Sequence, residues 1–474
     1  MIKRVFLLIL LSIAGIAFPS NGQVFYTSQN FNIRNTYGYE IVSGLPADEI
    51  VVFQDRLFHY EMYGLDSALQ TLWKKRIQLD IGVSHVIAVL RLDTAICLIL
   101  GYHQGHHSVI EAFLYDRRGE QISRQQLYVF TAHYDMSQMK WTESHNRKWG
   151  LIFFKSDDKT MRCLRIYLPA LRGLPPVDID FDTRQWRQQF QSAKITDHGF
   201  FAFAFVQTEG WLVKDERILL LIYGDTTNAF ERFKWTLKDH YITDAFLERS
   251  RDDYSIHCVG VYTNARYQAE GYWSVTMRPT HVDTALTLYP FTDEVRKKLI
   301  QSTKRKLGSA IHITHLINRT DGGFVIFGEM RRKNLRRTDI VRHIDLPSRE
   351  HFGWTDYYYD DVIAMSIHPD RTIHWTEILY KRQFSQDDNA IYSSYFIMHN
   401  TALLRVIYND NIERDPIVSE YLIGSEGVLD RRTLFRVKRR QWWLRWRDAK
   451  QTKVNEVLVP SQNYNILQLI KIRF

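Results

Sequence analysis

Short apolar segments recur along the chain, and polar turns separate them. They lie at residues 49–53, 96–100, 150–154, 200–205, 218–222, 323–327 and 403–407. These segments are rich in β-branched and aromatic residues and are too short for helices, so each of them predicts a strand. The pattern predicts an all-β protein.

The composition supports a folded chain. Of 474 residues, 45% are hydrophobic and 14% are aromatic, whereas disordered chains carry few aromatic residues. Charged residues make up 24%, which excludes a polytopic membrane protein. A formal net charge of +9 favours anionic partners without naming one.

The N-terminal residues predict a secretory signal. Lys3 and Arg4 precede an apolar run at 5–17, and turn-forming residues follow at 19–22. We therefore predict a signal peptide at 1–22, with cleavage near Gly22 or Gln23, and a single mature domain at 23–474. A buried N-terminal helix or a membrane anchor is the alternative. No later stretch is both apolar and long enough to cross a membrane as a helix. We expect export to the periplasm, the outer surface or the medium.

The strands repeat with turns of similar design, as at 114–122, 366–375 and 422–429. Tryptophan recurs on the outgoing strand at Trp73, Trp235 and Trp375, at intervals of 162 and 140 residues. Each interval is near three blades of about 50 residues. The repeats predict a β-propeller of about seven or eight four-stranded blades, and the alternative is two β-sandwich domains. We expect a last strand at 465–474 that closes the ring by pairing near 37–43.

One helix is predicted at 293–307, with Thr292 as its cap, on the surface of the rim. The three cysteines, Cys97, Cys163 and Cys258, lie among apolar residues. We expect buried thiols.

The segment 361–375, followed by 381–383 and 392–395, resembles uncharacterised secreted bacterial β-propeller-like proteins with a WD40- or kelch-like repeat architecture. Their repeat runs from a strand through a Pro-Asp-Gly turn into an Ile-x-Trp strand, and 321–329 is similar to their strand opener. Arg371 stands where such turns usually carry glycine. The resemblance covers about 315–410 and implies a fold but no catalytic residues. Strict WD-repeat and kelch signatures are absent.

Two segments combine basic and aromatic side chains, which bind anions and stack on rings. They contribute Arg331, Arg332, Arg336 and Arg337, and Arg439, Arg440, Trp442, Trp443 and Trp446. They predict a patch for an anionic glycan, an envelope surface or an unknown protein, without specific nucleic-acid binding. In the alternative, the tryptophans pack inward between blades and the arginines are solvated.

Acidic and aromatic residues at 356–361 form another candidate ligand site, with Tyr357, Tyr358 and Asp360 as contacts. The acids could also serve calcium binding or glycoside chemistry, or could simply mark a turn. His103, His106 and His107 are weak metal candidates, because their spacing matches no zinc signature, and a polar loop tip is the favoured alternative.

No nucleophile elbow, zinc-protease motif or phosphate-binding loop occurs in the chain, and no cofactor is indicated. The sequence favours a non-catalytic binding or scaffolding protein. A carbohydrate-active enzyme on a propeller scaffold and an envelope-surface anion-binding protein remain the alternatives.

Overall fold

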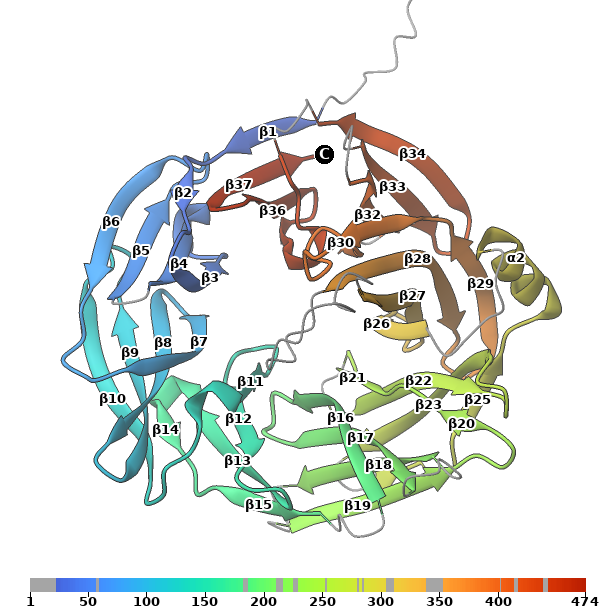
Figure 1. Cartoon of the computed structure of the whole chain (residues 1–474), viewed down its shortest axis with the longest axis horizontal. Helices are drawn as coiled ribbons and strands as arrows, with labels where there is room; N and C mark the ends of the chain where they lie inside the picture. The colour runs from blue at the N-terminus through green and yellow to red at the C-terminus, as the bar shows by residue number, and fades with distance from the viewer. Residues whose placement is uncertain are drawn as a thin grey trace, which may run out of the picture.

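The computed structural model describes residues 23–56, 59–181, 186–209, 216–224, 229–251, 254–278, 281–283, 285–303, 311–337, 353–400, 402–412, 417–437 and 442–474. The predicted signal peptide at 1–22 lies outside them. Within this part of the chain, the strands form eight antiparallel sheets, which stand as blades around a ring (Figure 1). The predicted all-β propeller is confirmed with eight blades, and the alternative of two β-sandwiches is wrong.

The first four blades follow one another in chain order. In each of them the first strand lies nearest the centre of the ring (Figure 1). Blade one contains β3 (Thr36–Val42), β4 (Ile50–Arg56), β5 (His59–Leu65) and β6 (Thr71–Ile77). Blade two contains β7 (Ser84–Leu92), β8 (Ala95–Gln104), β9 (His107–Tyr115) and β10 (Gln121–Phe130). Blade three contains β11 (Lys140–Glu143), β12 (Trp149–Lys155), β13 (Thr160–Tyr167), β14 (Arg172–Gly173) and β15 (Val177–Asp180). Blade four contains β16 (Trp186–Ile195), β17 (Phe201–Glu209), β18 (Glu216–Gly224) and β19 (Ala229–Thr236).

The other four blades complete the ring. Blade five contains β20 (Tyr241–Ile242), β21 (Phe246–Arg249), β22 (Ile256–Thr263), β23 (Ala269–Arg278), β24 (His281–Val282) and β25 (Thr287–Pro290). Blade six contains β26 (Ile311–Asn318), β27 (Phe324–Arg337), β28 (Gly353–Ile367), β29 (Ile373–Leu379) and β30 (Gln383–Gln386). Blade seven contains β31 (Tyr395–His399), β32 (Leu403–Asn411), β33 (Ile417–Gly424) and β34 (Leu429–Arg436). Blade eight contains β35 (Lys450–Lys453), β36 (Glu456–Asn463), β37 (Ile466–Arg473), β1 (Val24–Thr27) and β2 (Phe31–Asn32). Four 3₁₀ turns are described: η1 (Pro46–Asp48), η2 (Met136–Gln138), η3 (Leu168–Ala170) and η5 (Trp446–Asp448).

Blade eight closes the ring by joining strands from both ends of the described chain. Val24 pairs with Arg473, and Phe31 pairs with Leu467, so β1 and β2 both lie along β37. The expected partner at 37–43 is wrong, because that segment is β3, the inner strand of blade one. β36 takes one edge of β37, and β1 and β2 cover the other edge, which would otherwise remain unpaired.

Each sheet buries both of its faces, because it packs between two neighbouring blades. In β17, Phe201, Phe203 and Phe205 pack on one side with residues of blade three, whereas Ala202 and Ala204 pack on the other side with residues of blade five. Successive side chains of a strand point to opposite faces. The alternation of large and small residues therefore decides how closely each pair of blades approaches.

The three recurring tryptophans all lie on the fourth strand of a blade: Trp73 on β6, Trp235 on β19 and Trp375 on β29. The ring of Trp73 covers Gly119 in the β9–β10 turn of the next blade, where a Cβ atom would lie 2.8 Å from it. Trp73 and Trp235 are three blades apart, as expected, but Trp235 and Trp375 are only two. Blades five and six are longer, because they include a helix and a long hairpin.

This helix, α2 (Asp293–Thr303), lies outside the ring beside β29 (Figure 1). The Thr292 Oγ1 caps it by accepting a hydrogen bond of 3.3 Å from the Val295 N–H. Val295 and Leu299 are buried against blades five and six, and Ile300 is exposed. The helix is confirmed over 293–303, and the predicted residues 304–307 lie outside the described residues.

The three cysteines are all buried and free, as expected. Burial raises the pKa of the Cys97 thiol to about 12, so it stays protonated. Among the described residues, no helix has the length and apolar character needed to cross a membrane.

Candidate functional site

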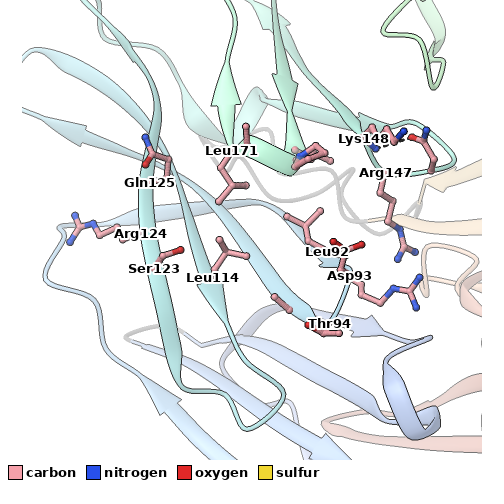
Figure 2. Close-up of a pocket in the computed structure, with 16 residues that line it drawn as sticks. Leu92, Asp93, Thr94, Leu114, Ser123, Arg124, Gln125, Arg147, Lys148 and Leu171 are labelled. Atoms are coloured by element: carbon pink, nitrogen blue, oxygen red, sulfur yellow. Dashed lines mark hydrogen bonds between the residues drawn. The ribbon is translucent and has the colours of Figure 1, made fainter.

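A cavity of about 650 Å³ opens between blades two and three (Figure 2). Its walls come from β7, β9 and β10 of blade two, and from the β11–β12 turn and η3 of blade three. Leu92, Leu114 and Leu171 from the two blades surround its interior (Figure 2). The lining is thus apolar inside, and charged residues stand at its edge.

The charge at the edge is predominantly positive. Arg91, Arg147 and Lys148 line the cavity, and Asp93 is the one acid among the lining residues. Arg124 also lines it but points away from the other labelled residues (Figure 2), because its guanidinium pairs with Glu111 and Asp80. Three basic groups against one acid in the lining favour an anionic ligand, and Glu143, outside the lining, offsets part of the charge of Arg147.

Tight turns hold these charged residues in place. Asp93 begins a two-residue hairpin turn between β7 and β8 with φ of 48°, a left-handed conformation that Asp tolerates better than most residues. Arg147 also has a positive φ, 55°. Its turn is braced by Asn146, whose N–H donates to Asp197 Oδ1 of blade four at 2.8 Å, and whose Oδ1 accepts from the Lys148 N–H at 2.9 Å. The basic groups are therefore presented by an ordered backbone.

Two guanidinium nitrogens in this wall lack an acceptor. Arg91 Nε and Arg147 Nη1 are buried and have no hydrogen-bond partner among the described residues. Arg147 is otherwise held by Glu143, with 3.4 Å between Nε and Oε1. Buried N–H groups are nearly always paired, and hydrogen bonds from a guanidinium to an anion are among the stronger ones.

The lining residues suit binding better than acid–base catalysis. Asp93 stands without a second carboxylate, histidine or cysteine among them. General acid–base chemistry needs titratable groups placed for proton transfer. The lining offers charge and shape instead.

The basic segment at 331–337 and the tyrosines at 357–359 lie on neighbouring strands of one hairpin. On the hairpin of β27 and β28, Arg331 lies opposite Tyr359, Arg332 opposite Tyr358 and Lys333 opposite Tyr357. The three cations lie over the facing tyrosine rings at 5.0, 4.6 and 5.6 Å from their centroids. Cation and ring pair across the strands.

Nearby acids compensate the charge of this hairpin. Glu329 holds Arg331 at 2.7 Å, Asp360 lies 3.5 Å from Arg332, and Asp356 pairs with Arg336. Arg337 ends β27, and its side chain is outside the described set. The expected open anionic-ligand patch is therefore not what the described part of the hairpin presents, because most of its positive charge is already paired.

The acids at 356–361 each have a structural partner. Asp356 also accepts from Gln386 Nε2 at 3.1 Å, and Asp361 Oδ1 accepts from the Lys381 N–H at 3.1 Å. Asp356 and Asp361 are buried, at 1% and 2% exposure. Asp356, Asp360 and Asp361 do not line the cavity between blades two and three. They are also absent from the lining of a second cavity, which lies between blades eight and one.

The tryptophans of the second basic segment pack inward. Trp446 is fully buried and donates to Asn409 Oδ1 at 3.0 Å, so it belongs to the core and the prediction of a ligand contact is wrong for it. Trp442 lies 5.5 Å from the Phe25 ring of β1, and Trp443 lies 5.3 Å from the Tyr392 ring. Both are partly buried. Arg439 and Arg440 lie outside the described residues.

The candidate metal histidines lie at one hairpin turn. His103 stacks on His133 with 3.5 Å between ring centroids, while His106 and His107 are exposed. Burial and the neighbouring His133 lower the pKa of His103. Within the described residues, no group of three possible ligands gathers that could hold a metal ion.

Sequence reasoning missed the cavity between blades two and three. Arg91 and Asp93 belong to one hairpin, and Arg147 and Lys148 to another, more than fifty residues further along. None of them forms a charge run. The single local signal was the two-residue turn at Asp93 and Thr94, which indicates a hairpin but not a ligand.

Comparisons with known proteins identify no family for this chain. No protein-family model matches the chain, and no curated protein matches it. Among solved structures, the β-propeller domain of the Trilobed protease from Pyrococcus furiosus is 10% identical, covering 85% of this chain and 98% of its own, with a TM-score of 0.35. An uncharacterized protein from Listeria monocytogenes EGD-e is 6% identical over 82% and 91% of the chains, with a TM-score of 0.39. Prolyl oligopeptidase B from Galerina marginata is 8% identical over 93% and 56%, also at 0.39.

Proposed function

We propose that this protein is an exported, non-catalytic propeller that binds a small anionic ligand in the cavity between blades two and three. The observation that carries the proposal is the pair of buried guanidinium nitrogens, Arg91 Nε and Arg147 Nη1, that have no acceptor among the described residues. Both arginines line the same cavity. Export rests on the basic, apolar and polar succession in residues 1–22.

The ligand combines an anionic group with a compact apolar body. The basic edge suits a carboxylate, sulfate or phosphate, and the leucines inside suit carbon and hydrogen surface. A volume of about 650 Å³ is that of a small-molecule site rather than of a macromolecular interface. The anionic group of a glycan and that of an envelope lipid share this chemistry.

Calorimetric titration with glucuronate, sulfate and glycerol phosphate tests the proposal. We expect binding by at least one of the three, at least a tenfold loss of affinity in Arg147→Gln, and a marked fall in affinity with added salt. Separate arms with free anions and with vesicles containing an anionic phospholipid distinguish a soluble source from a membrane source.

The chain offers a matched control within blade three. Lys148 lines the cavity, whereas Lys159 is an exposed lysine in the turn at the opposite end of the same sheet. Lys148→Gln should weaken binding, and Lys159→Gln should not. The proposal is refuted if none of the three anions binds, or if both lysine variants change the affinity equally.

Export has its own test. Expression of the full chain in a bacterial host, followed by N-terminal sequencing of the protein in the periplasm and medium, should show a chain that begins near Gln23. Retention of the whole protein in the cytoplasm with Met1 intact would contradict export without affecting the anion cavity.

A further inference from the structure

A second cavity, of about 570 Å³, lies at the seam where blade eight meets blade one. Its walls come from the inner strand β3 on one side, and from η5, β35 and the β36–β37 turn on the other. Its residues differ entirely from those of the cavity between blades two and three. We propose that this second cavity binds an uncharged, polyhydroxylated ring ligand, that is, a neutral carbohydrate.

Two exposed tyrosines flank the cavity. Tyr37 is 74% exposed and Tyr464 is 90% exposed, and both line it. Tyr37 occupies a β-bulge, where the pairing of β3 with β4 shifts between Thr36 and Gly38. A bulge turns a side chain away from its regular direction, and bulges cluster near binding sites. Tyr464 starts the β36–β37 turn with φ of 49°. Large aromatic faces left in water offer a surface for the apolar C–H face of a sugar ring.

Three polar groups of this cavity lack partners. Thr36 Oγ1, the Tyr39 hydroxyl and Arg445 Nε are buried and have no hydrogen-bond partner among the described residues. All three residues line the cavity. A buried polar group without a partner costs stability, and a polar ligand that reached these groups would complete their hydrogen bonding. Together the three groups offer two hydroxyls and a donor, which complement sugar hydroxyls.

The surrounding contacts hold these groups in position. Arg445 bonds to Gln462 Oε1 and pairs with Asp448, and its guanidinium carbon lies 5.4 Å from the centroid of the Tyr39 ring. Burial raises the pKa of Tyr39 well above its usual value, so the phenol stays protonated and can donate. The site is organised before any ligand arrives, which reduces the entropy lost on binding.

The charges of this cavity balance. Arg445 and Lys450 are matched by Asp448 and Glu40 among the lining residues. Arg445 pairs with Asp448, and Lys450 Nζ donates to the Ile41 carbonyl of β3. Unlike the cavity between blades two and three, this one carries no net charge that would favour an anion, so an uncharged ligand fits it best.

Titration with neutral oligosaccharides of glucose, xylose, mannose and N-acetylglucosamine, followed by calorimetry and saturation-transfer NMR, tests the proposal. We expect at least one of them to bind, with an affinity that is the same at about 50 mM and about 500 mM salt. Tyr464→Ala should weaken binding about tenfold through loss of the aromatic face. Tyr39→Phe, which removes only the hydroxyl, should weaken it about fivefold.

Tyr254→Ala is the control, because Tyr254 is also an exposed tyrosine, at 60%, and it lies in the β21–β22 turn of blade five, outside the lining of this cavity. Thermal unfolding of each variant checks that it is folded. The proposal is overturned if none of the four sugars binds, if Tyr464→Ala and Tyr39→Phe leave the affinity unchanged, or if Tyr254→Ala weakens it equally. Because the anion cavity shares none of these residues, failure here and failure there are distinguishable.

Discussion

Lys381→Met should destabilise the protein strongly, because Lys381 forms a fully buried ion pair with Glu329. Their side chains are 1% and 0% exposed, and Nζ lies 2.7 Å from Oε1. Lys381 also donates to Gln383 Oε1 at 2.9 Å. Glu329 additionally accepts from Arg331 Nε at 2.7 Å and from the Ser394 hydroxyl at 2.8 Å. These bonds join blade six to the segment that enters blade seven.

The electrostatics set the size of the effect. Burial acts to raise the pKa of the Glu329 carboxyl, but Lys381 and Arg331 outweigh it and hold that pKa below its usual value. The carboxylate is thus ionised in the core. Removing one partner of a buried ion pair typically costs about 3–5 kcal/mol. For a chain of this size, the entropy of unfolding is on the order of 1 kcal/mol per degree, so the Tm should fall by about 3–5 °C.

Urea unfolding followed by tryptophan fluorescence measures the loss, and a double-mutant cycle tests its origin. Glu329→Gln combined with Lys381→Met should cost about 2 kcal/mol less than the sum of the single variants, because the Lys381–Glu329 pair is lost only once and Arg331 is the one charge left without its partner. Lys298→Met is the control, since Lys298 pairs with Glu294 on the exposed face of α2, and it should cost far less than Lys381→Met. A loss in Lys381→Met no larger than in Lys298→Met, or strictly additive costs in the cycle, would refute this reasoning.

Three further outcomes are expected. First, burial and then Arg331 lower the pKa of His315 to about 4, so the free energy of unfolding should be highest above about pH 6.5 and should fall as pH drops toward 4. In His315→Asn, the free energy of unfolding measured with urea should depend less on pH over this range. Second, burial raises the pKa of Asp55 to about 6, so the stability that this carboxyl contributes below about pH 4 is lost as pH rises through 6. Asp55→Asn should therefore be more stable than the original protein at pH 7, by about 1 kcal/mol after discounting for the partial exposure of Asp55 to solvent. Equal stability of the two proteins at pH 7 would contradict this prediction. Third, Gly119→Ala should lower the stability by about 1–2 kcal/mol, because φ is 74° and the new Cβ would meet the Trp73 ring, whereas Gly105→Ala, with φ of 60° in open space, should cost less.

The local sequence predicted where the turn at Arg371 lies but not the contact that stabilises its backbone. The resemblance placed this turn between two strands, and β28 and β29 indeed flank it. Arg371 adopts the φ of 68° that glycine usually supplies, and its guanidinium pairs with Asp283 of blade five at 2.7 Å. The conformational preference of an arginine argues against this geometry. A contact with a different blade, invisible in the local sequence, stabilises it.

The candidate sites could be predicted less well than the fold. The basic segment 331–337 and the tyrosines at 357–359 were each predicted as ligand contacts, because side chains of one kind cluster there in the sequence. Once they pair across β27 and β28, with Glu329, Asp356 and Asp360 beside them, they mainly stabilise the hairpin. The two cavities draw on residues that are singly placed and come from different blades, so no sequence window contains either set.

Local chemistry alone determined that this chain would form short strands joined by tight turns, with buried thiols and a capped helix at 293–303. Alternating apolar residues, turn formers and a capping threonine act over a few residues, and their effect can be read without knowing the neighbours. The tertiary structure alone decided that there are eight blades, that β1 rather than β3 closes the ring along β37, and which charges are paired. Those outcomes depend on which sheets pack together and on burial. Glu329 compensates Arg331 on one hairpin, whereas Arg91 Nε at a cavity wall has no acceptor among the described residues.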